Sequence, residues 1–274
     1  MIHETRHRLI HLRLGLRHQR LFGTSIAVDM ANVVGARPSD ECARRANRQQ
    51  HAFARNRFGR IDRRCAGERH RFLEAGTRGI APDHLRQYAH IAAKIGSPIV
   101  RCVIDTNDHQ PDVQEIIKTL KEVLPAFEKQ GVTLAIENHD RFQAKTLANL
   151  MLALRGAPIG ICLDVANSLG REEPMRHVVE TLAPFTVNLH IKEYVIKRLP
   201  SYQGFVVHGA PFSQGMCDLD WLLPYLKANT TANFNVILEQ WAPAQATVED
   251  TIALEERWAR ESIAYLQRKY FPSL

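Results

Sequence analysis

The chain has 274 residues, of which 45% are hydrophobic, and a formal net charge of +7 at pH 7. This apolar share suffices for a sizeable core, and no apolar run approaches the ~18 residues of a membrane span. The N-terminus lacks the apolar segment of a signal peptide, and the five cysteines form no CxxC pair, so a disulfide framework is excluded. We expect a single cytoplasmic domain over residues 1–274, with no membrane partner.

The positive charge is confined to the first quarter of the chain. Residues 1–75 contain 16 Arg, no Lys and seven Asp or Glu, whereas residues 76–274 contain 20 Lys or Arg and 22 Asp or Glu. A nucleic-acid-binding arm is one interpretation, but aromatic residues are few there and no DNA-reading motif fits. We therefore expect no nucleic-acid partner.

A shifted reading frame is a further interpretation of this first quarter. One allowed set of codons for residues 43–54 gives an apolar strand when it is read in the next frame. On this interpretation the segment between about residues 15 and 72 is not native to the fold.

From residue 71 onward, apolar runs typical of buried strands alternate six times with helical patterns. The expected strands are residues 71–77, 97–105, 132–137, 159–164, 185–191 and 236–238. The expected helices are residues 82–96, 111–131, 145–154, 175–182, 220–227 and 248–266. The first two helices begin with Pro-Asp and end with Gly, as helices commonly do.

Continuous apolar strands separated by helices indicate a parallel sheet that is covered on its faces. A (β/α)8 TIM barrel takes roughly 250 residues, so we expect this α/β fold. Residues 76–274 would supply units 3–8, and residues 1–75 two atypical units. An open doubly wound sheet is the alternative, but the chain has no Gly-rich phosphate loop.

Four of the expected strands end in ionisable residues, namely Glu137, Asp164, His190 and Glu239. In barrels the active site lies at these C-terminal strand ends. Two Glu, one Asp and one His form a mostly oxygen ligand set that suits Mn²⁺, Mg²⁺ or Co²⁺. Each residue also has a structural alternative: Asp164 caps the next helix, His190 is a core histidine, and Glu239 pairs with an Arg.

The motifs "AIENHDRF", "ICLDVANSLG", "NLHIKEY" and "VILEQW" carry these four residues. In order and spacing they resemble the xylose-isomerase-like TIM-barrel superfamily, in its sugar phosphate isomerase/epimerase branch, which includes ketose 3-epimerases. The resemblance covers about residues 74–274. It implies an isomerase or epimerase in which Glu137, Asp164, His190 and Glu239 bind one divalent metal. Glu137 and Glu239 would also be the catalytic pair that moves a proton through an enediolate.

Residues near these motifs are candidates for substrate contacts because of their position and chemistry: His139, Asn167, Lys192, Arg198 and Trp241. Asn167 stands where many relatives carry His. The alternatives are a loop cap for His139, a solvated charge for Arg198 and packing for Trp241.

The expected partner is a small-molecule sugar, phosphorylated or not, and a homo-oligomer is left open. A metal-dependent dehydratase or lyase of a sugar-like acid would use the same residues. A non-catalytic sugar-binding or degenerate homologue is the alternative that the unusual first 75 residues favour.

Overall fold

The computed structural model describes residues 24–25, 74–230 and 232–271. Two predictions concern the first 75 residues: two atypical units, and a shifted frame between about residues 15 and 72. Apart from β1 (Thr24–Ser25) and the start of the next strand, this segment lies outside the described residues. β1 pairs antiparallel with the first long strand.

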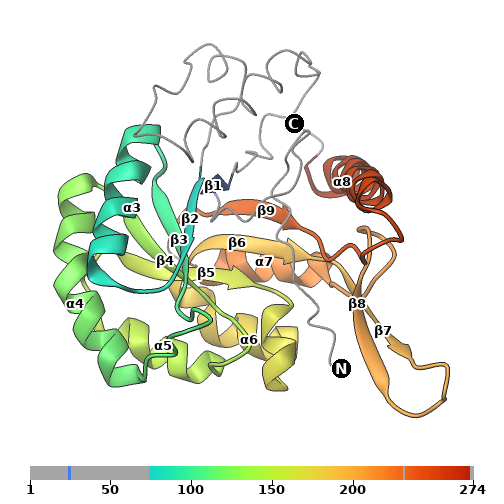
Figure 1. Ribbon diagram of the computed structural model, residues 1–274, viewed down its shortest axis with the longest axis horizontal. Coiled ribbons are helices and arrows are strands. Elements are labelled where there is room, and N and C mark those ends of the chain that lie inside the picture. Colours follow the sequence, from blue (N-terminus) through green and yellow to red (C-terminus); the bar gives the residue numbers. More distant parts are fainter. Residues whose placement is uncertain (1–23, 26–73, 231, 272–274) are drawn as a thin grey trace.

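The described strands form a curled parallel sheet (Figure 1). In spatial order, these parallel strands are β2 (Glu74–Arg78), β3 (Ile99–Val103), β4 (Thr133–Glu137), β5 (Ile159–Asp164), β6 (Thr186–Lys192) and β9 (Asn235–Glu239). Each of the six strand predictions is confirmed. Because all six run in the same direction, their C-terminal ends meet at one edge of the sheet.

Helices follow the strands and cover the outer face of the sheet (Figure 1). They are α3 (Pro82–Ile95), α4 (Val113–Gln130), α5 (Ala144–Ala153), α6 (Met175–Leu182), α7 (Leu219–Asn229) and α8 (Val248–Tyr270), with short 3₁₀ turns at Asn167–Arg171 and Ala183–Phe185. These bounds confirm the helix predictions to within a few residues. Within the described ranges, no helix combines the length and apolarity needed to cross a membrane.

The helix ends show why the sequence breaks where it does. Asp112 caps α4, because its carboxylate accepts the backbone N–H of Glu115 at 2.8 Å. Gly131 ends the same helix in the left-handed conformation, with φ of 64°, which glycine adopts without a steric penalty. Gly96 ends α3 in the same way, with φ of 76°.

The two faces of each strand differ in chemistry. Side chains such as Leu134, Ile136, Ile161 and Leu163 point to the helices and belong to the main core. Alternate residues point to the inner face. Next to a small apolar cluster of Ile99, Ala135 and Cys162, this face carries buried polar residues: Glu74, Arg101, Glu137, Asp164, Asn188, His190, Lys192 and Glu239. Strand alternation thus separates the packing face from the face that carries the ionisable groups.

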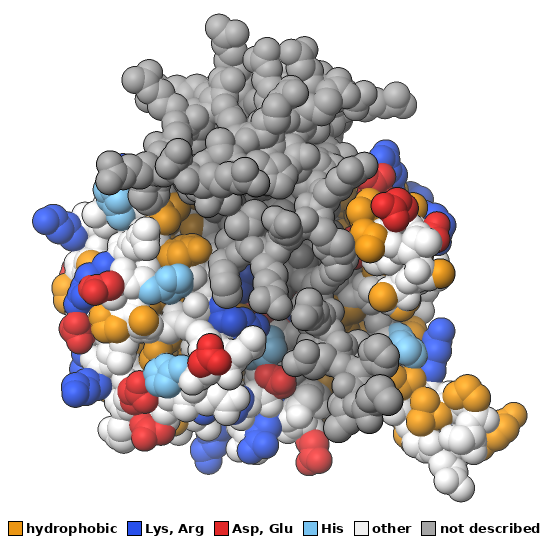
Figure 2. Space-filling model, in the orientation of Figure 1, with side chains coloured by type: hydrophobic (Ala, Val, Ile, Leu, Met, Phe, Trp, Pro, Cys, Tyr) orange, Lys and Arg blue, Asp and Glu red, His pale blue; other side chains and the backbone are white. Residues whose placement is uncertain are grey.

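An antiparallel hairpin, which sequence analysis does not predict, follows β6. It consists of β7 (Tyr194–Arg198) and β8 (Phe205–Gly209) and projects away from the sheet (Figure 1). Large apolar side chains on it are exposed, among them Ile196 and Phe205 (Figure 2).

The Asp112 cap gives a stability prediction. We expect Asp112→Ala to lower the free energy of unfolding by about 1 kcal/mol, because it leaves a helix N–H without its side-chain acceptor. Asp83→Ala is the matched control, since Asp83 lies in the first turn of α3 without capping it and should change stability by less than about 0.5 kcal/mol. Urea unfolding of both variants measures the difference, and equal effects would contradict the assigned cap.

Candidate metal centre

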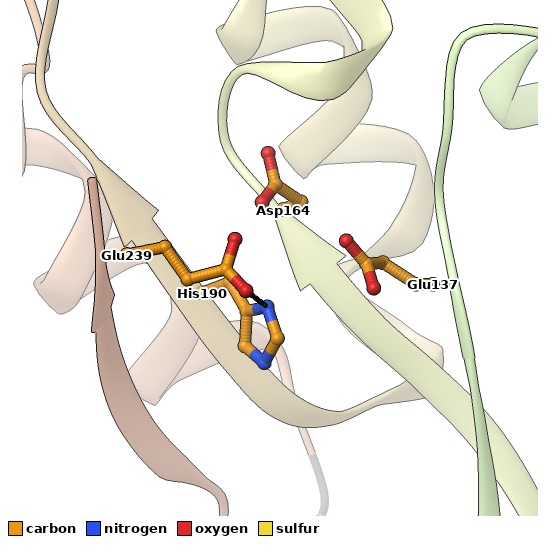
Figure 3. Close-up of side chains that lie close together, drawn as sticks. All are labelled: Glu137, Asp164, His190 and Glu239. Atoms are coloured by element: carbon orange, nitrogen blue, oxygen red, sulfur yellow. Dashed lines mark ion pairs between the residues drawn. The ribbon is translucent and has the colours of Figure 1, made fainter. Parts of the chain in front are cut away.

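Four side chains from four strand ends meet at the C-terminal edge of the sheet. Glu137, Asp164, His190 and Glu239, here called the quartet, extend from β4, β5, β6 and β9 toward one shared space (Figure 3). Each offers one ligand atom, and these atoms all lie within 4.8 Å of one another. The quartet is fully buried, and strand pairing explains the convergence, since Asp164 lies opposite His190 in the ladder.

Asp164 has two roles: it caps the turn that follows its strand, and it belongs to the quartet. Its Oδ1 accepts the backbone N–H groups of Ala166 and Asn167 at 2.9 and 2.8 Å, and so caps the following turn. Its Oδ2 lies 2.8 Å from Lys192 Nζ. The Asn138 amide fixes the Asp164 backbone by accepting its N–H and donating to its carbonyl. One oxygen therefore holds the loop while the other faces the quartet.

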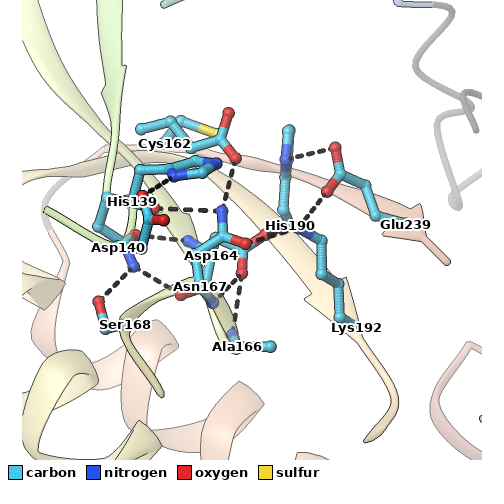
Figure 4. Close-up of polar contacts among 12 residues, drawn as sticks. His139, Asp140, Cys162, Asp164, Ala166, Asn167, Ser168, His190, Lys192 and Glu239 are labelled. Atoms are coloured by element: carbon cyan, nitrogen blue, oxygen red, sulfur yellow. Dashed lines mark hydrogen bonds and ion pairs between the residues drawn. The ribbon is translucent and has the colours of Figure 1, made fainter. Parts of the chain in front are cut away.

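Lys192 is buried, and its side chain reaches two members of the quartet (Figure 4). Its Nζ lies 2.8 Å from Asp164 Oδ2 and 2.7 Å from Glu239 Oε2, and it donates to Asn167 Oδ1 at 3.0 Å. Burial lowers the pKa of Lys192, but these carboxylates outweigh that effect and raise it. The site therefore favours the charged form of Lys192.

Glu239 is held ionised by its neighbours. Burial alone would raise the pKa of the carboxyl group, but the Lys192 ammonium and the His190 imidazole outweigh it and hold that pKa well below its ordinary value. Glu239 Oε1 lies 3.1 Å from His190 Nδ1. A buried carboxylate that is held in its ionised form is suited to bind a cation.

Glu137 is positioned by two polar partners. The Asn167 amide donates to Glu137 Oε1 at 2.9 Å, and Arg101 Nη1 lies 3.3 Å from Oε2. Asn167 thus bridges Glu137 and Lys192, since its Oδ1 accepts from the ammonium.

The quartet fits a divalent cation on two observations. First, several of its buried atoms have no hydrogen bond of acceptable geometry: Glu137 Oε2, Asp164 Oδ2, both His190 ring nitrogens and both Glu239 oxygens. Second, charges on the inner face of the described strands are unequal, with carboxylates at Glu74, Glu137, Asp164 and Glu239 against cations at Arg101, Lys192 and, when it is protonated, His190. A bound divalent ion would use the free lone pairs and balance the carboxylates.

The model of the family described as xylose isomerase-like TIM barrel matches residues 73–269. The chain belongs to this family. The 3-oxo-isoapionate decarboxylase of Pectobacterium atrosepticum is 34% identical over 194 residues, which are 71% of this chain and 70% of that protein.

Solved structures of low sequence identity share the fold. The xylose isomerase domain protein from Planctomyces limnophilus superposes with a TM-score of 0.54 at 16% identity, covering 70% of this chain and 71% of that one. The D-psicose 3-epimerase from Clostridium cellulolyticum H10, solved with D-tagatose, gives 0.54 at 14% identity, covering 77% and 82%. The TIM-barrel prediction is confirmed.

The remaining expected contact residues of this xylose isomerase-like chain lie in different places. Trp241 is near the quartet, because Lys192 Nζ lies 5.1 Å from the centre of its ring. His139 is partly exposed, and its Nδ1 contacts the Asp140 carboxylate at 2.5 Å.

Arg198 does not join the quartet. It is exposed on the β7–β8 hairpin, where its guanidinium donates to the Tyr202 carbonyl and lies over the Phe205 ring. This placement agrees with the alternative of a solvated charge, because the strand that follows Lys192 turns away from the sheet instead of lining it.

Three buried polar residues on the inner face are missed by sequence reasoning. Glu74, Arg101 and Asn188 lie at the starts or middles of their strands. The available signal is spacing, because Asn188, His190 and Lys192 alternate along one strand and must share a face. The expectation that functional residues lie at the C-terminal ends of strands does not cover these positions.

The double role of Asp164 gives a prediction. Asp164→Asn keeps an oxygen that can accept the Ala166 and Asn167 N–H groups, so we expect a folded chain with nearly unchanged stability. The lost charge should weaken Mn²⁺ binding by at least about 100-fold, since even residues outside the ligand shell change metal affinity by 10–100-fold. Calorimetric titration and thermal unfolding measure the two effects. Unchanged Mn²⁺ affinity would show that Asp164 is a cap alone.

Proposed function

We propose that this chain is a divalent-metal-dependent enzyme that forms an enediolate from a sugar-like oxo compound. The observation that carries the proposal is the quartet, whose four ligand atoms lie within 4.8 Å of one another. A bound Mn²⁺, Mg²⁺ or Co²⁺ would stabilise negative charge on adjacent substrate oxygens. The metal's identity and the sugar are parts of this proposal.

The chain's own residues would divide the proton transfer between them. Glu239 is ionised and buried, so it can remove a proton from the carbon next to the carbonyl group. Glu137 extends from β4, several strands away from β9 in the sheet, and can deliver a proton from a different direction. Two carboxylates on different sides of the substrate support epimerisation, whereas one carboxylate acting twice supports isomerisation.

Lys192 and Trp241 would complete the substrate site. When Asp164 and Glu239 bind a cation, Lys192 Nζ would be released from these carboxylates and could donate to an oxygen of the substrate. Trp241, whose ring lies beside that ammonium, provides an apolar wall for the sugar carbons. Asn167 would position Glu137 and Lys192, since its amide contacts both.

Decarboxylation of a 3-oxo sugar acid is the second candidate, favoured by the 34% identical relative, which is named a 3-oxo-isoapionate decarboxylase. Loss of CO₂ from the carbon next to the oxo group leaves the electron pair of the broken bond as an enediolate. A protonated residue, Glu137 in this proposal, then returns one proton to that carbon. The same site serves both reactions, and they differ in whether a proton or CO₂ leaves.

The candidate reactions can be separated by one substrate screen. The full chain with Mn²⁺, Mg²⁺ or Co²⁺ is incubated in D₂O with ketoses, their phosphates and 3-oxo sugar acids. We expect deuterium at the reacting carbon in either case, and release of CO₂ from the 3-oxo acids alone if the chain is a decarboxylase. Product formed without deuterium from the solvent would contradict the enediolate route.

The roles of the two glutamates give a further prediction. Glu137→Gln and Glu239→Gln should each lower turnover by at least about 100-fold, the usual contribution of a positioned acid or base. Glu173→Gln is the control, because Glu173 is a buried glutamate that accepts the Ala144 N–H away from the quartet. Initial rates on the substrate found in the screen, with circular dichroism to confirm folding, decide the result. Full activity in either quartet variant would remove that residue from the mechanism.

A further inference from the structure

A fourth carboxylate lies on the opposite side of His190 from the rest of the quartet. Glu74, at the start of β2, is 1% exposed, and its Oε1 lies 3.8 Å from His190 Nε2. The Asn188 amide donates to the same oxygen at 2.9 Å, whereas Glu74 Oε2 has no hydrogen-bond partner within the described part of the chain. Burying a carboxylate with so few partners costs free energy. A neighbouring group that interacts with the charge of Glu74 would offset this cost.

The geometry of the imidazole suggests that role. Nδ1 faces the other three quartet members and lies 3.1 Å from Glu239 Oε1, while Nε2 points away from them (Figure 3). A histidine nitrogen that binds a cation must present a lone pair, so the ring proton must sit on the other nitrogen. Nδ1 can therefore be a ligand when Nε2 carries the proton, and a buried N–H needs an acceptor.

Among the described residues, Glu74 and Cys162 both lie beside the ring and can accept this proton. The Cys162 thiol lies beside the ring, but a thiol sulfur is a weak acceptor. A carboxylate is a much stronger one. The 3.8 Å separation is within the range of an ion pair but longer than a hydrogen bond, so this contact must shorten when Glu74 accepts the Nε2–H.

We propose that Glu74 is a positioning residue for His190: it accepts the Nε2–H and thereby holds the imidazole in the tautomer whose Nδ1 faces the quartet. This inference rests on the metal site of the proposed function. Its expected effect is on metal affinity and on the ring tautomer, both of which can be measured without substrate.

The tautomer is tested on the unmodified full chain. The protein is labelled with ¹⁵N-histidine, loaded with diamagnetic Zn²⁺, and studied by two-bond ¹H–¹⁵N correlation, with His190 assigned by its loss in His190→Asn. We expect the proton on Nε2 and the metal on Nδ1. The reverse arrangement would overturn the inference without any variant of Glu74. Failure of the unmodified chain to bind Zn²⁺ or Mn²⁺ would instead overturn the proposed function.

Variants of Glu74 test the energetic role by Mn²⁺ titration calorimetry. Glu74→Leu removes the acceptor and should weaken binding by about 10-fold or more, whereas Glu74→Gln keeps a neutral acceptor and should fall between Leu and Glu. Two controls should bind as the parent does: Cys162→Ala, and Glu173→Gln, which alters a second buried glutamate beside a histidine, with 3.5 Å between Glu173 Oε1 and His177 Nε2. Parent-like affinity in Glu74→Leu, or an equal loss in Cys162→Ala, would contradict the proposal.

Discussion

Unequal burial of opposite charges on the inner face of the sheet is the constraint on which the site depends. Glu74, Glu137, Asp164 and Glu239 face Arg101 and Lys192 across a space from which solvent is excluded. Water cannot screen these groups, so their mutual repulsion is relieved by neighbouring cations, by hydrogen bonds from Asn167 and Asn188, or by a bound ion. Each of these contacts fixes a side chain that would otherwise have several rotamers. The same contacts thus reduce the electrostatic cost of burying the charges and hold the side chains of the site in fixed positions.

The alternation of each strand allows this polar interior to exist within a stable fold. Residues such as Leu134 and Ile136 bury apolar surface against the helices, while Glu137 on the same strand faces inward. The free energy gained on the outer face offsets the cost of the charges on the inner face. The strands that carry the ionisable groups of the site therefore also contribute apolar side chains to the core.

The sequence predicts those features that have a local signature. The six strands and their helices follow from hydrophobic period and from caps such as Asp112 and Gly131, and the quartet follows from strand ends that share one edge. Glu74 is not predictable in this way, because its contact with His190 joins positions more than a hundred residues apart. Arg198 is close to Lys192 in sequence, but the chain leaves the sheet between them and forms a hairpin. The local sequence pattern does not predict the direction of this hairpin.

Three successive inward residues of β6 lie at three depths of the sheet interior. Asn188 contacts Glu74, His190 belongs to the quartet, and Lys192 lies nearest the end of the strand. Leu189 and Ile191, between them, belong to the core under the helices. Deleting or inserting one residue within this strand would exchange the two sets, placing charges against the helices and aliphatic side chains in the site. A change of chain length beyond Lys192, where the hairpin begins, leaves these residues in register, so the hairpin can lengthen or shorten while the chemistry beneath it stays in place.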